Sequence, residues 1–150
     1  MARDGPDENA ERRMNFEFSK AYLRNMHSMK EKLAAFERLL NIMSDLRTQC
    51  PWDRKQTFES LRHLTIEETY ELSEAIIDGD LEEIRKETGD LLLHMVFYAQ
   101  IASERAPEDG GWDISDSLKG ICDKLIDRQP HIYGDVEAND EETVKDNWEQ

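Results

Sequence analysis

The sequence predicts an all-α protein of the four-helix-bundle type, and three observations support this class. Apolar residues recur at intervals of three and four along several segments, which is the period of an amphipathic helix. Segments that contain proline or paired glycines separate these stretches. The chain has 150 residues, 38% of them hydrophobic and 35% charged, so it can form one modest core. We therefore expect oligomerisation to complete that core.

The first predicted helix follows a polar stretch. Residues 1–15 contain Gly5 and Pro6 and offer little apolar surface, so we expect a loose tail there and a single helical domain over residues 16–150. Leu33, Phe36, Leu40 and Met43 then recur at helical spacing. This spacing predicts a helix from about Met29 to Arg47.

The next two predicted helices are joined by a short turn. Pro51 favours a loop at residues 50–53. The second helix is expected to begin near Thr65, with Glu68 as the third residue of a capping box, and to end at Asp78 before Gly79. Asp80 is expected to cap the third helix.

The third predicted helix is nearly apolar in its second half, which indicates burial in the centre of the bundle. Its apolar residues are Leu81, Ile84, Leu91, Leu92, Met95, Val96, Ala99 and Ile101. A loop at residues 107–112 leads to a fourth helix, which we expect to end before Pro130. A final turn or helix is expected over about residues 141–150.

The bulk properties of the chain exclude several classes. A formal net charge of −15 argues against binding to duplex DNA, because that affinity comes from clustered Lys and Arg. No apolar run approaches the roughly 18 residues of a membrane span. Cys50 and Cys122 lack the spacing of a zinc site or a disulfide framework, so we expect reduced thiols in a cytoplasmic protein.

Two predicted helices carry closely spaced carboxylates. Glu67, Glu68 and Glu71 share one face of the second helix, and Glu87 and Asp90 share one face of the third. If the two helices pack antiparallel, the acidic residues converge. Each neighbouring pair would then repel by about 3 kcal/mol at roughly 5 Å and an effective dielectric near 20, so convergence implies a bound cation.

Other interpretations of these residues remain open. Glu68 could serve only as a capping residue, and acidic residues are common on solvated faces. An all-oxygen ligand set suits Mg²⁺ or Mn²⁺ rather than zinc. A di-iron site would use Glu-x-x-His motifs, which this sequence lacks. His94 follows Asp90 by four residues, and we favour a buried, hydrogen-bonded core histidine over a ligand.

These motifs together resemble the MazG nucleotide pyrophosphohydrolases. The resemblance extends from about Leu46 to His131, with a further element at residues 147–149. Its motifs are Cys-Pro-Trp-Asp at 50–53, Glu-Glu-Thr-Tyr-Glu at 67–71, Glu87-x-x-Asp90 within a Gly-Asp-Leu-Leu motif at 89–92, Val-Phe-Tyr-Ala-Gln at 96–100 and Asp-Lys-Leu at 123–125.

The resemblance implies an all-α nucleoside triphosphate pyrophosphatase fold, a homo-oligomer (dimer or tetramer), and Mg²⁺-dependent cleavage between the α and β phosphates. Its implied metal ligands are Glu68, Glu71, Glu87 and Asp90. Glu67 or a ligating glutamate such as Glu71 would orient or deprotonate the attacking water. The expected role is maintenance of the nucleotide pool.

Four further residues are candidates for substrate binding. Lys124 and Arg128 share a face of the fourth helix and could bind the β and γ phosphates, or could simply be a solvated basic spot near a helix end. Trp52 and Trp148 could stack on a base or pack against the bundle. The segment 127–131 has one basic residue and one histidine fewer than the family commonly shows, which weakens the expected phosphate site.

Two alternatives to this enzyme remain. One is a non-catalytic helical module that keeps the fold and binds a nucleotide or a protein. The other is hydrolysis of a different phosphorylated metabolite. Crowded carboxylates disfavour the first, because a module without chemistry has no need for them.

Overall fold

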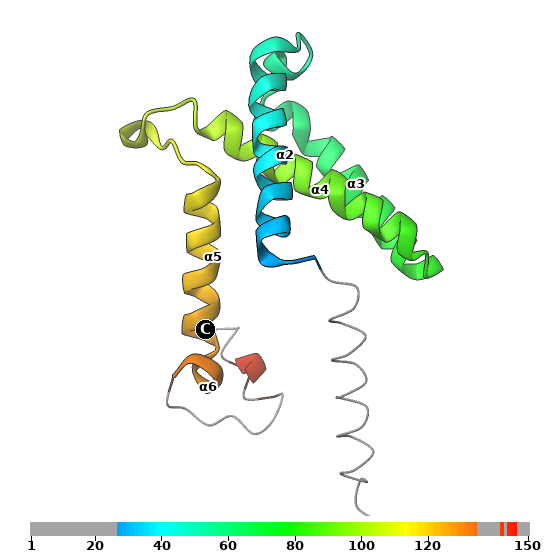
Figure 1. Ribbon diagram of the computed structural model, residues 1–150, viewed down its shortest axis with the longest axis vertical. Helices are drawn as coiled ribbons and strands as arrows, with labels where there is room; N and C mark the ends of the chain where they lie inside the picture. Colours follow the sequence, from blue (N-terminus) through cyan, green and yellow to red (C-terminus); the bar gives the residue numbers. More distant parts are fainter. Residues whose placement is uncertain (1–26, 135–141, 143, 147–150) are drawn as a thin grey trace, which may run out of the picture. The chain divides into compact units, whose positions relative to one another are not determined.

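The computed structural model describes residues 27–134, 142 and 144–146. The chain divides into two compact units, residues 1–38 and 39–150. All regular structure in the described residues is helical, so the predicted all-α class is confirmed (Figure 1). None of the described helices combines the length and the apolar character that crossing a bilayer requires. The predicted tail at residues 1–15 lies outside the described residues.

Helix α2 spans Met29–Gln49, two residues beyond the predicted end. Ser28 and Glu31 form its capping box: the Ser28 amide donates to the Glu31 carboxylate at 2.7 Å, and the Glu31 amide donates to the Ser28 hydroxyl at 3.2 Å. Met43 is fully buried. The loop after α2 contains the short 3₁₀ helix η1 (Asp53–Lys55).

Arg47, near the end of α2, holds this loop in place. Its Nη1 donates to the carbonyl oxygens of Asp53 at 2.6 Å and Gln56 at 3.0 Å. Its Nε and Nη2 donate to the carboxylate of Glu104 at 2.6 and 3.0 Å. One guanidinium therefore ties α2, the loop with η1 and the segment after α4 together.

Helix α3 spans Phe58–Asp78, so the prediction that it begins near Thr65 was wrong. Thr57 is the N-cap, and its side chain forms a capping box with Ser60. Thr65-x-x-Glu68 has the usual sequence of a capping box, whereas Thr57-x-x-Ser60 has serine in place of the glutamate or glutamine. Helix α3 nevertheless begins after Thr57, which follows the extended Gln56, while Thr65 lies inside the helix and contacts α4.

The turn between α3 and α4 follows the sequence prediction. Gly79 takes the left-handed conformation, with φ of 68°, that ends a helix. The Asp80 side chain then accepts the amides of Glu82 and Glu83 at 3.0 and 3.1 Å and begins α4 (Leu81–Ala102). This tight connection makes α3 and α4 an antiparallel hairpin, seen in green in Figure 1.

Helix α4 contributes more buried residues than any other described helix, as its apolar second half predicts. They are His94, Val96, Phe97, Ala99, Ile101 and Ala102. Leu92 and Met95 on the same helix remain 46% and 44% exposed. The central position of α4 is therefore confirmed, while part of its apolar surface is uncovered in the single chain.

Helix α5 spans Ile114–Arg128 and ends before Pro130, as predicted. It follows the 3₁₀ helix η2 (Pro107–Asp109), and Asp113 and Asp116 form its capping box. Pro130 then begins a four-residue helix, α6 (Pro130–Tyr133), which the sequence analysis missed. Of the expected final helix, only Glu142 and residues 144–146 are described, and they are helical.

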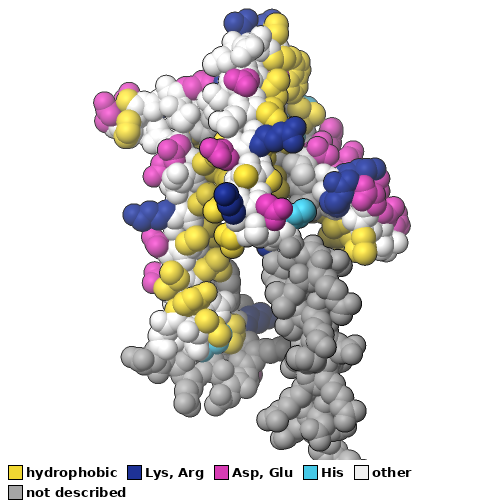
Figure 2. Space-filling view, in the orientation of Figure 1, with side chains coloured by type: hydrophobic (Ala, Val, Ile, Leu, Met, Phe, Trp, Pro, Cys, Tyr) yellow, Lys and Arg dark blue, Asp and Glu magenta, His cyan; other side chains and the backbone are white. Residues whose placement is uncertain are grey.

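The apolar face of α5 is not covered by the described residues. No residue of α5 is buried, although the helix is strongly amphipathic. Figure 2 shows apolar side chains along α5 on the face in view. Its exposed apolar residues are Leu118, Ile121, Leu125 and Ile126. A large apolar surface of this kind is typical of a contact with another chain.

Candidate active site

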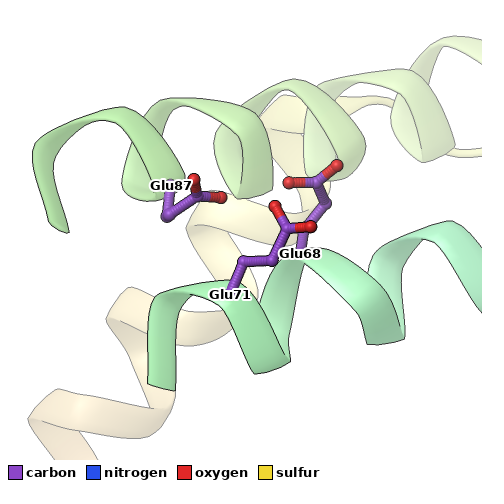
Figure 3. A group of neighbouring side chains, drawn as sticks. All are labelled: Glu68, Glu71 and Glu87. Atoms are coloured by element: carbon purple, nitrogen blue, oxygen red, sulfur yellow. The ribbon is translucent and has the colours of Figure 1, made fainter. Parts of the chain in front are cut away.

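Three glutamates converge between α3 and α4. Glu68 and Glu71 come from α3 and Glu87 comes from α4, and one carboxylate oxygen of each lies within 4.8 Å of the others. Figure 3 shows their carboxylates in the space between the two helices. We call Glu68, Glu71 and Glu87 the glutamate cluster. The structure thus brings together residues that are up to 19 positions apart (87 − 68 = 19).

The position of Glu68 in α3 removes one alternative interpretation. Because α3 begins at Phe58, Glu68 lies in the middle of the helix and not in its first turn. A capping role, which would explain its presence without any ligand, therefore does not apply. Its side chain instead lies in the half-buried seam that faces α4.

The glutamate cluster is electrostatically strained in the absence of a cation. Partial burial raises the pKa of Glu68, and the negative charges of Asp90 and Glu71 raise it further. Partial burial likewise raises the pKa of Glu87, followed by the charge of Glu71. These shifts have the direction expected for like charges held together. A divalent cation among them would remove the repulsion.

The donor set of the cluster fits a hard divalent cation. All the available ligand atoms are carboxylate oxygens, which Mg²⁺ and Mn²⁺ prefer. In addition, Oε2 of Glu87 is buried and has no hydrogen-bond partner among the described residues. A buried carboxylate oxygen is costly to leave unpaired, and a coordinated cation would satisfy it.

Asp90 and Glu67 lie at the edge of this arrangement. Asp90 is exposed and falls outside the group of oxygens within 4.8 Å, although its charge raises the pKa of Glu68. Glu67 is also exposed on α3, and its charge is a smaller contribution to the same shift. Both are near the cluster without being part of its core.

An acidic groove opens beside the glutamate cluster, toward the turn between α3 and α4. Its volume is about 270 Å³, and six of its seven lining residues are acidic. They are Glu71, Glu74, Asp78, Asp80, Glu83 and Glu87, with Ala75 as the seventh. The nearby bases Arg85 and Lys86 on α4 are paired with Glu82 and Glu83. A polyphosphate would be repelled from this groove unless cations neutralised it.

His94 is a buried, hydrogen-bonded core residue, as the sequence analysis favoured. It is 9% exposed, and its Nδ1 lies 2.7 Å from the hydroxyl of Thr65. Burial lowers its pKa, and the charge of Asp90 opposes this shift. The neutral imidazole is therefore the form that the fold favours, and it is not among the clustered ligand atoms.

Sequence analysis missed the contacts of two residues next to the cluster: Thr65 was expected only to begin a helix, and Tyr98 was noted only within the motif at residues 96–100. The Thr65 hydroxyl lies 2.5 Å from the hydroxyl of Tyr98 on α4. The spacing of residues was the available signal. Thr65 precedes Glu68 by three positions and Tyr98 follows His94 by four, so each continues a helix face already identified.

The predicted phosphate-binding residues are not brought to α3 within the single chain. Lys124 and Arg128 lie on α5, which in the described part of the chain contacts α4 and α6 but not α3. Lys124 is exposed and Arg128 is half-buried. Of the predicted stacking residues, Trp52 lies in the loop after α2 and is 54% exposed. Trp148 lies outside the described residues.

Comparison with known proteins identifies relatives of this chain. A family model described as "MazG nucleotide pyrophosphohydrolase domain" matches residues 56–133, which include the α3–α4 hairpin and α5. The chain is 44% identical over 117 residues to the nucleoside triphosphate pyrophosphohydrolase of Escherichia coli K12. It is 49% identical over 109 residues to the nucleoside triphosphate pyrophosphohydrolase/pyrophosphatase MazG of Thermotoga maritima.

The chain spans less than half the length of these two relatives. The two alignments cover 76% and 71% of this chain but only 43% and 41% of the two relatives. A solved structure of a mazG-related protein from Thermotoga maritima superposes with a TM-score of 0.61 at 27% identity. That match covers 76% of this chain and 99% of the other. The fold is therefore shared over nearly the whole of a solved relative.

Proposed function

This chain belongs to the MazG nucleotide pyrophosphohydrolase family, and from that premise we propose that it hydrolyses nucleoside triphosphates to monophosphates and pyrophosphate. The single observation that carries the proposal is the glutamate cluster, in which three carboxylates lie within 4.8 Å of one another on the α3–α4 hairpin. Ribose and deoxyribose triphosphates are both candidate substrates.

The proposed metal ligands are Glu68, Glu71 and Glu87 of the cluster, together with Asp90 at its edge. The proposed ion is Mg²⁺, for which Mn²⁺ could substitute. When bound, such an ion neutralises phosphate oxygens and lowers the pKa of a coordinated water. The unpartnered Oε2 of Glu87 and the raised pKa values of Glu68 and Glu87 support this assignment.

The reaction requires a base that accepts the proton of the attacking water. We assign this role to Glu67 or Glu71, both of which are exposed on α3. The water oxygen forms a bond to the α phosphorus while the bond from that phosphorus to the α–β bridging oxygen breaks. Pyrophosphate leaves with the bridging oxygen. The protein mainly positions charge in this scheme.

Substrate recognition is assigned to basic and aromatic side chains outside the acidic groove. We propose that Lys124 and Arg128 bind the β and γ phosphates and that Trp52 and Trp148 stack on the base. A bidentate guanidinium suits a phosphate, and a flat indole suits a base of any identity. The exposure of Lys124 and Trp52 leaves both accessible to a ligand.

We further propose that the protein is a homo-oligomer. Leu118, Ile121, Leu125 and Ile126 on α5 are exposed in the single chain, as are Leu92 and Met95 on α4. Covering such residues is the usual reason for stable association between identical chains. The proposed setting is the cytoplasmic nucleotide pool, which the free thiols of Cys50 and Cys122 fit.

Release of pyrophosphate provides the direct test. A panel of ordinary, deoxy and oxidised triphosphates would be incubated with the protein in Mg²⁺ and in chelator. We expect turnover only with Mg²⁺, and we expect Glu71→Gln and Asp90→Asn to lower kcat by at least about 100-fold. Glu74→Gln is the matched control, because Glu74 lies on the same helix and lines the groove outside the glutamate cluster.

Two results would reject the proposal. Wild-type turnover by Glu71→Gln and Asp90→Asn would show that the site is elsewhere. Calorimetric binding of a triphosphate in Mg²⁺ without any turnover would instead support a non-catalytic nucleotide-binding module. Other phosphorylated metabolites, added to the panel, test the remaining alternative, and turnover of one of them in place of the triphosphates would redirect the substrate assignment.

A further inference from the structure

The interface between α3 and α4 has a regular seam. Its positions on α3 are 61, 65, 68, 72 and 75, and those on α4 are 84, 87, 91, 94, 98 and 101. All of these residues are buried or half-buried, and the intervals alternate between three and four. This is the spacing of a coiled-coil seam, in which each helix presents one stripe to the other.

Two groups of polar residues lie on this seam. One contains Glu68 and Glu87 of the glutamate cluster. The other contains Thr65, His94 and Tyr98, which we call the Thr65 layer. The remaining seam positions are apolar: Leu61, Leu72, Ala75, Ile84, Leu91 and Ile101. The Thr65 layer therefore lies next to the carboxylates along the seam. Thr65 precedes Glu68 by three residues on α3, and His94 follows Asp90 by four residues on α4.

The hydrogen bonds of the Thr65 layer saturate the Thr65 hydroxyl. That hydroxyl donates its one proton to the carbonyl oxygen of Leu61 at 3.1 Å. Nδ1 of His94 and the hydroxyl of Tyr98 lie within hydrogen-bond distance of the same oxygen, at 2.7 and 2.5 Å. These contacts join α3 to α4 through one oxygen atom.

The Tyr98 side chain is itself held in position by aromatic contacts. Its ring stacks on Phe58 of the first turn of α3, with centroids 6.1 Å apart and an interplanar angle of 26°. The guanidinium of Arg105 lies over the ring of Phe58, 5.9 Å from its centroid. The ring that brings the Tyr98 hydroxyl to Thr65 is therefore packed against the start of α3.

We infer that the Thr65 layer sets the axial register of α3 against α4 and thereby holds the glutamate cluster together. Apolar layers tolerate sliding, whereas a buried polar layer forms its hydrogen bonds in one register only. The Gly79 turn restrains the hairpin at one end. Glu68 lies 11 residues from that turn, about 16 Å along the helix, so the cluster needs a second restraint on its far side. Thr65, His94 and Tyr98 are positioning residues in this account.

This inference rests on the proposed metal site, and the test separates the two. The variants are Thr65→Val, which removes the hydroxyl at nearly constant shape, and Thr65→Ser, which restores it. Thr69→Val is the matched control, because Thr69 is exposed and, among the described residues, its hydroxyl bonds only to the Thr65 carbonyl of its own helix, at 2.8 Å. Binding of Mg²⁺ alone is measured by calorimetry on the full chain, and stability by thermal melting.

We expect Thr65→Val to weaken Mg²⁺ binding by about tenfold or more, the usual effect of losing a group that orients metal ligands. Thr65→Ser and Thr69→Val should bind Mg²⁺ like the wild type. If Thr65→Val fails to fold, the variant that combines it with His94→Leu and Tyr98→Phe replaces the whole layer with apolar side chains. That protein should melt no lower than the wild type and still bind Mg²⁺ at least tenfold more weakly.

Crystal structures of the metal-free wild type and Thr65→Val provide a second readout. The carboxylate oxygens of Glu68 and Glu87 should separate beyond 4.8 Å in the variant. Unchanged separation together with unchanged Mg²⁺ affinity would overturn the inference. If the wild type itself bound no Mg²⁺, the proposed metal site would fail, while the two crystal structures would still decide whether the Thr65 layer sets the register.

Discussion

Arg47 and Glu104 form a forked ion pair across 57 residues of sequence, with Nε to Oε1 at 2.6 Å and Nη2 to Oε2 at 3.0 Å. The Arg47 side chain is 12% exposed, and its third nitrogen donates to two loop carbonyls. The planar guanidinium is the one side chain that can satisfy four acceptors in this fork. The pair therefore joins α2, the loop that carries Trp52 and the segment after α4.

Replacing Arg47 by lysine should destabilise the protein. A lysine ammonium cannot span both the Glu104 carboxylate and the carbonyls of Asp53 and Gln56, so at least one charged hydrogen bond is lost. We expect Arg47→Lys to lower the free energy of unfolding by about 1–3 kcal/mol in urea titrations. Arg62→Lys, at an exposed position of α3, is the control. Equal urea midpoints for the two variants would show that the fork contributes little.

Glu104 should make stability depend on pH in the acidic range. The hydrogen bond from Arg47 holds the pKa of Glu104 below its ordinary value of 4.5. Its contribution is therefore present above pH 4.5 and is lost as the pH falls through the lower folded-state pKa. The wild type should exceed Glu104→Gln by under about 1 kcal/mol at pH 7, because Glu104 is 45% exposed. This difference in stability should vanish in strong acid. A difference that stayed constant with pH would contradict the prediction.

Glu87 should have the opposite pH dependence in metal-free protein. Partial burial and the charge of Glu71 raise its folded-state pKa. Its stabilising contribution is present below the ordinary carboxyl pKa and is lost as the pH rises through the raised value. Metal-free Glu87→Gln should therefore melt at a higher temperature than the wild type at pH 7.5, and the difference should shrink below pH 4.5.

Mg²⁺ should reverse the order of stability of the wild type and Glu87→Gln. At a concentration 100-fold above its Kd, the ion adds about 2.7 kcal/mol to the free energy of unfolding of a protein that binds it. The wild type should gain that amount, and Glu87→Gln should gain much less. Scanning calorimetry with and without chelator measures both. An equal gain for both proteins would remove Glu87 from the ligand set.

Lys124 should affect substrate affinity more than turnover. Lys124→Met removes a charge assigned to the β and γ phosphates, so we expect KM for the triphosphate to rise about tenfold with kcat within about threefold. Lys119→Met removes the same charge from an exposed position of the same helix and should leave both constants unchanged. Equal effects of the two substitutions would reduce the role of Lys124 to general electrostatics.

The apolar face of α5 should mediate self-association. Leu118 is 46% exposed in the single chain, so Leu118→Lys should leave the stability of one chain nearly unchanged. It should raise the dissociation constant of the oligomer by about 30-fold or more, measured by sedimentation equilibrium. Ser117→Lys, which adds the same charge at an exposed neighbouring position, is the control. A wild type that sediments as a single chain would reject the proposed oligomer outright.

Several elements could be predicted from local signals alone. The Gly79–Asp80 turn was recognised because a glycine and a capping carboxylate act within a few residues of themselves. The end of α5 before Pro130 was also predicted from a local signal, because proline disfavours helical geometry in the residue before it. The start of α3 could not be predicted in this way, because the stronger capping-box sequence, at residues 65–68, lies inside the helix and the chain uses residues 57–60. Thr65 instead contacts His94 and Tyr98 on α4, which its neighbours in the sequence do not reveal.

The periodicity of the chain was enough to place Glu68 and Glu71 on one helix face and Glu87 on another, because a helix repeats every 3.6 residues whatever surrounds it. Folding added the alignment of the two faces, which put those three carboxylates within 4.8 Å and left Asp90 at the edge. Alignment depends on the seam between α3 and α4, where side chains distant in sequence meet. The same reason explains why the exposure of the apolar face of α5 among the described residues emerged only from the folded chain: exposure is a property of packing, not of spacing.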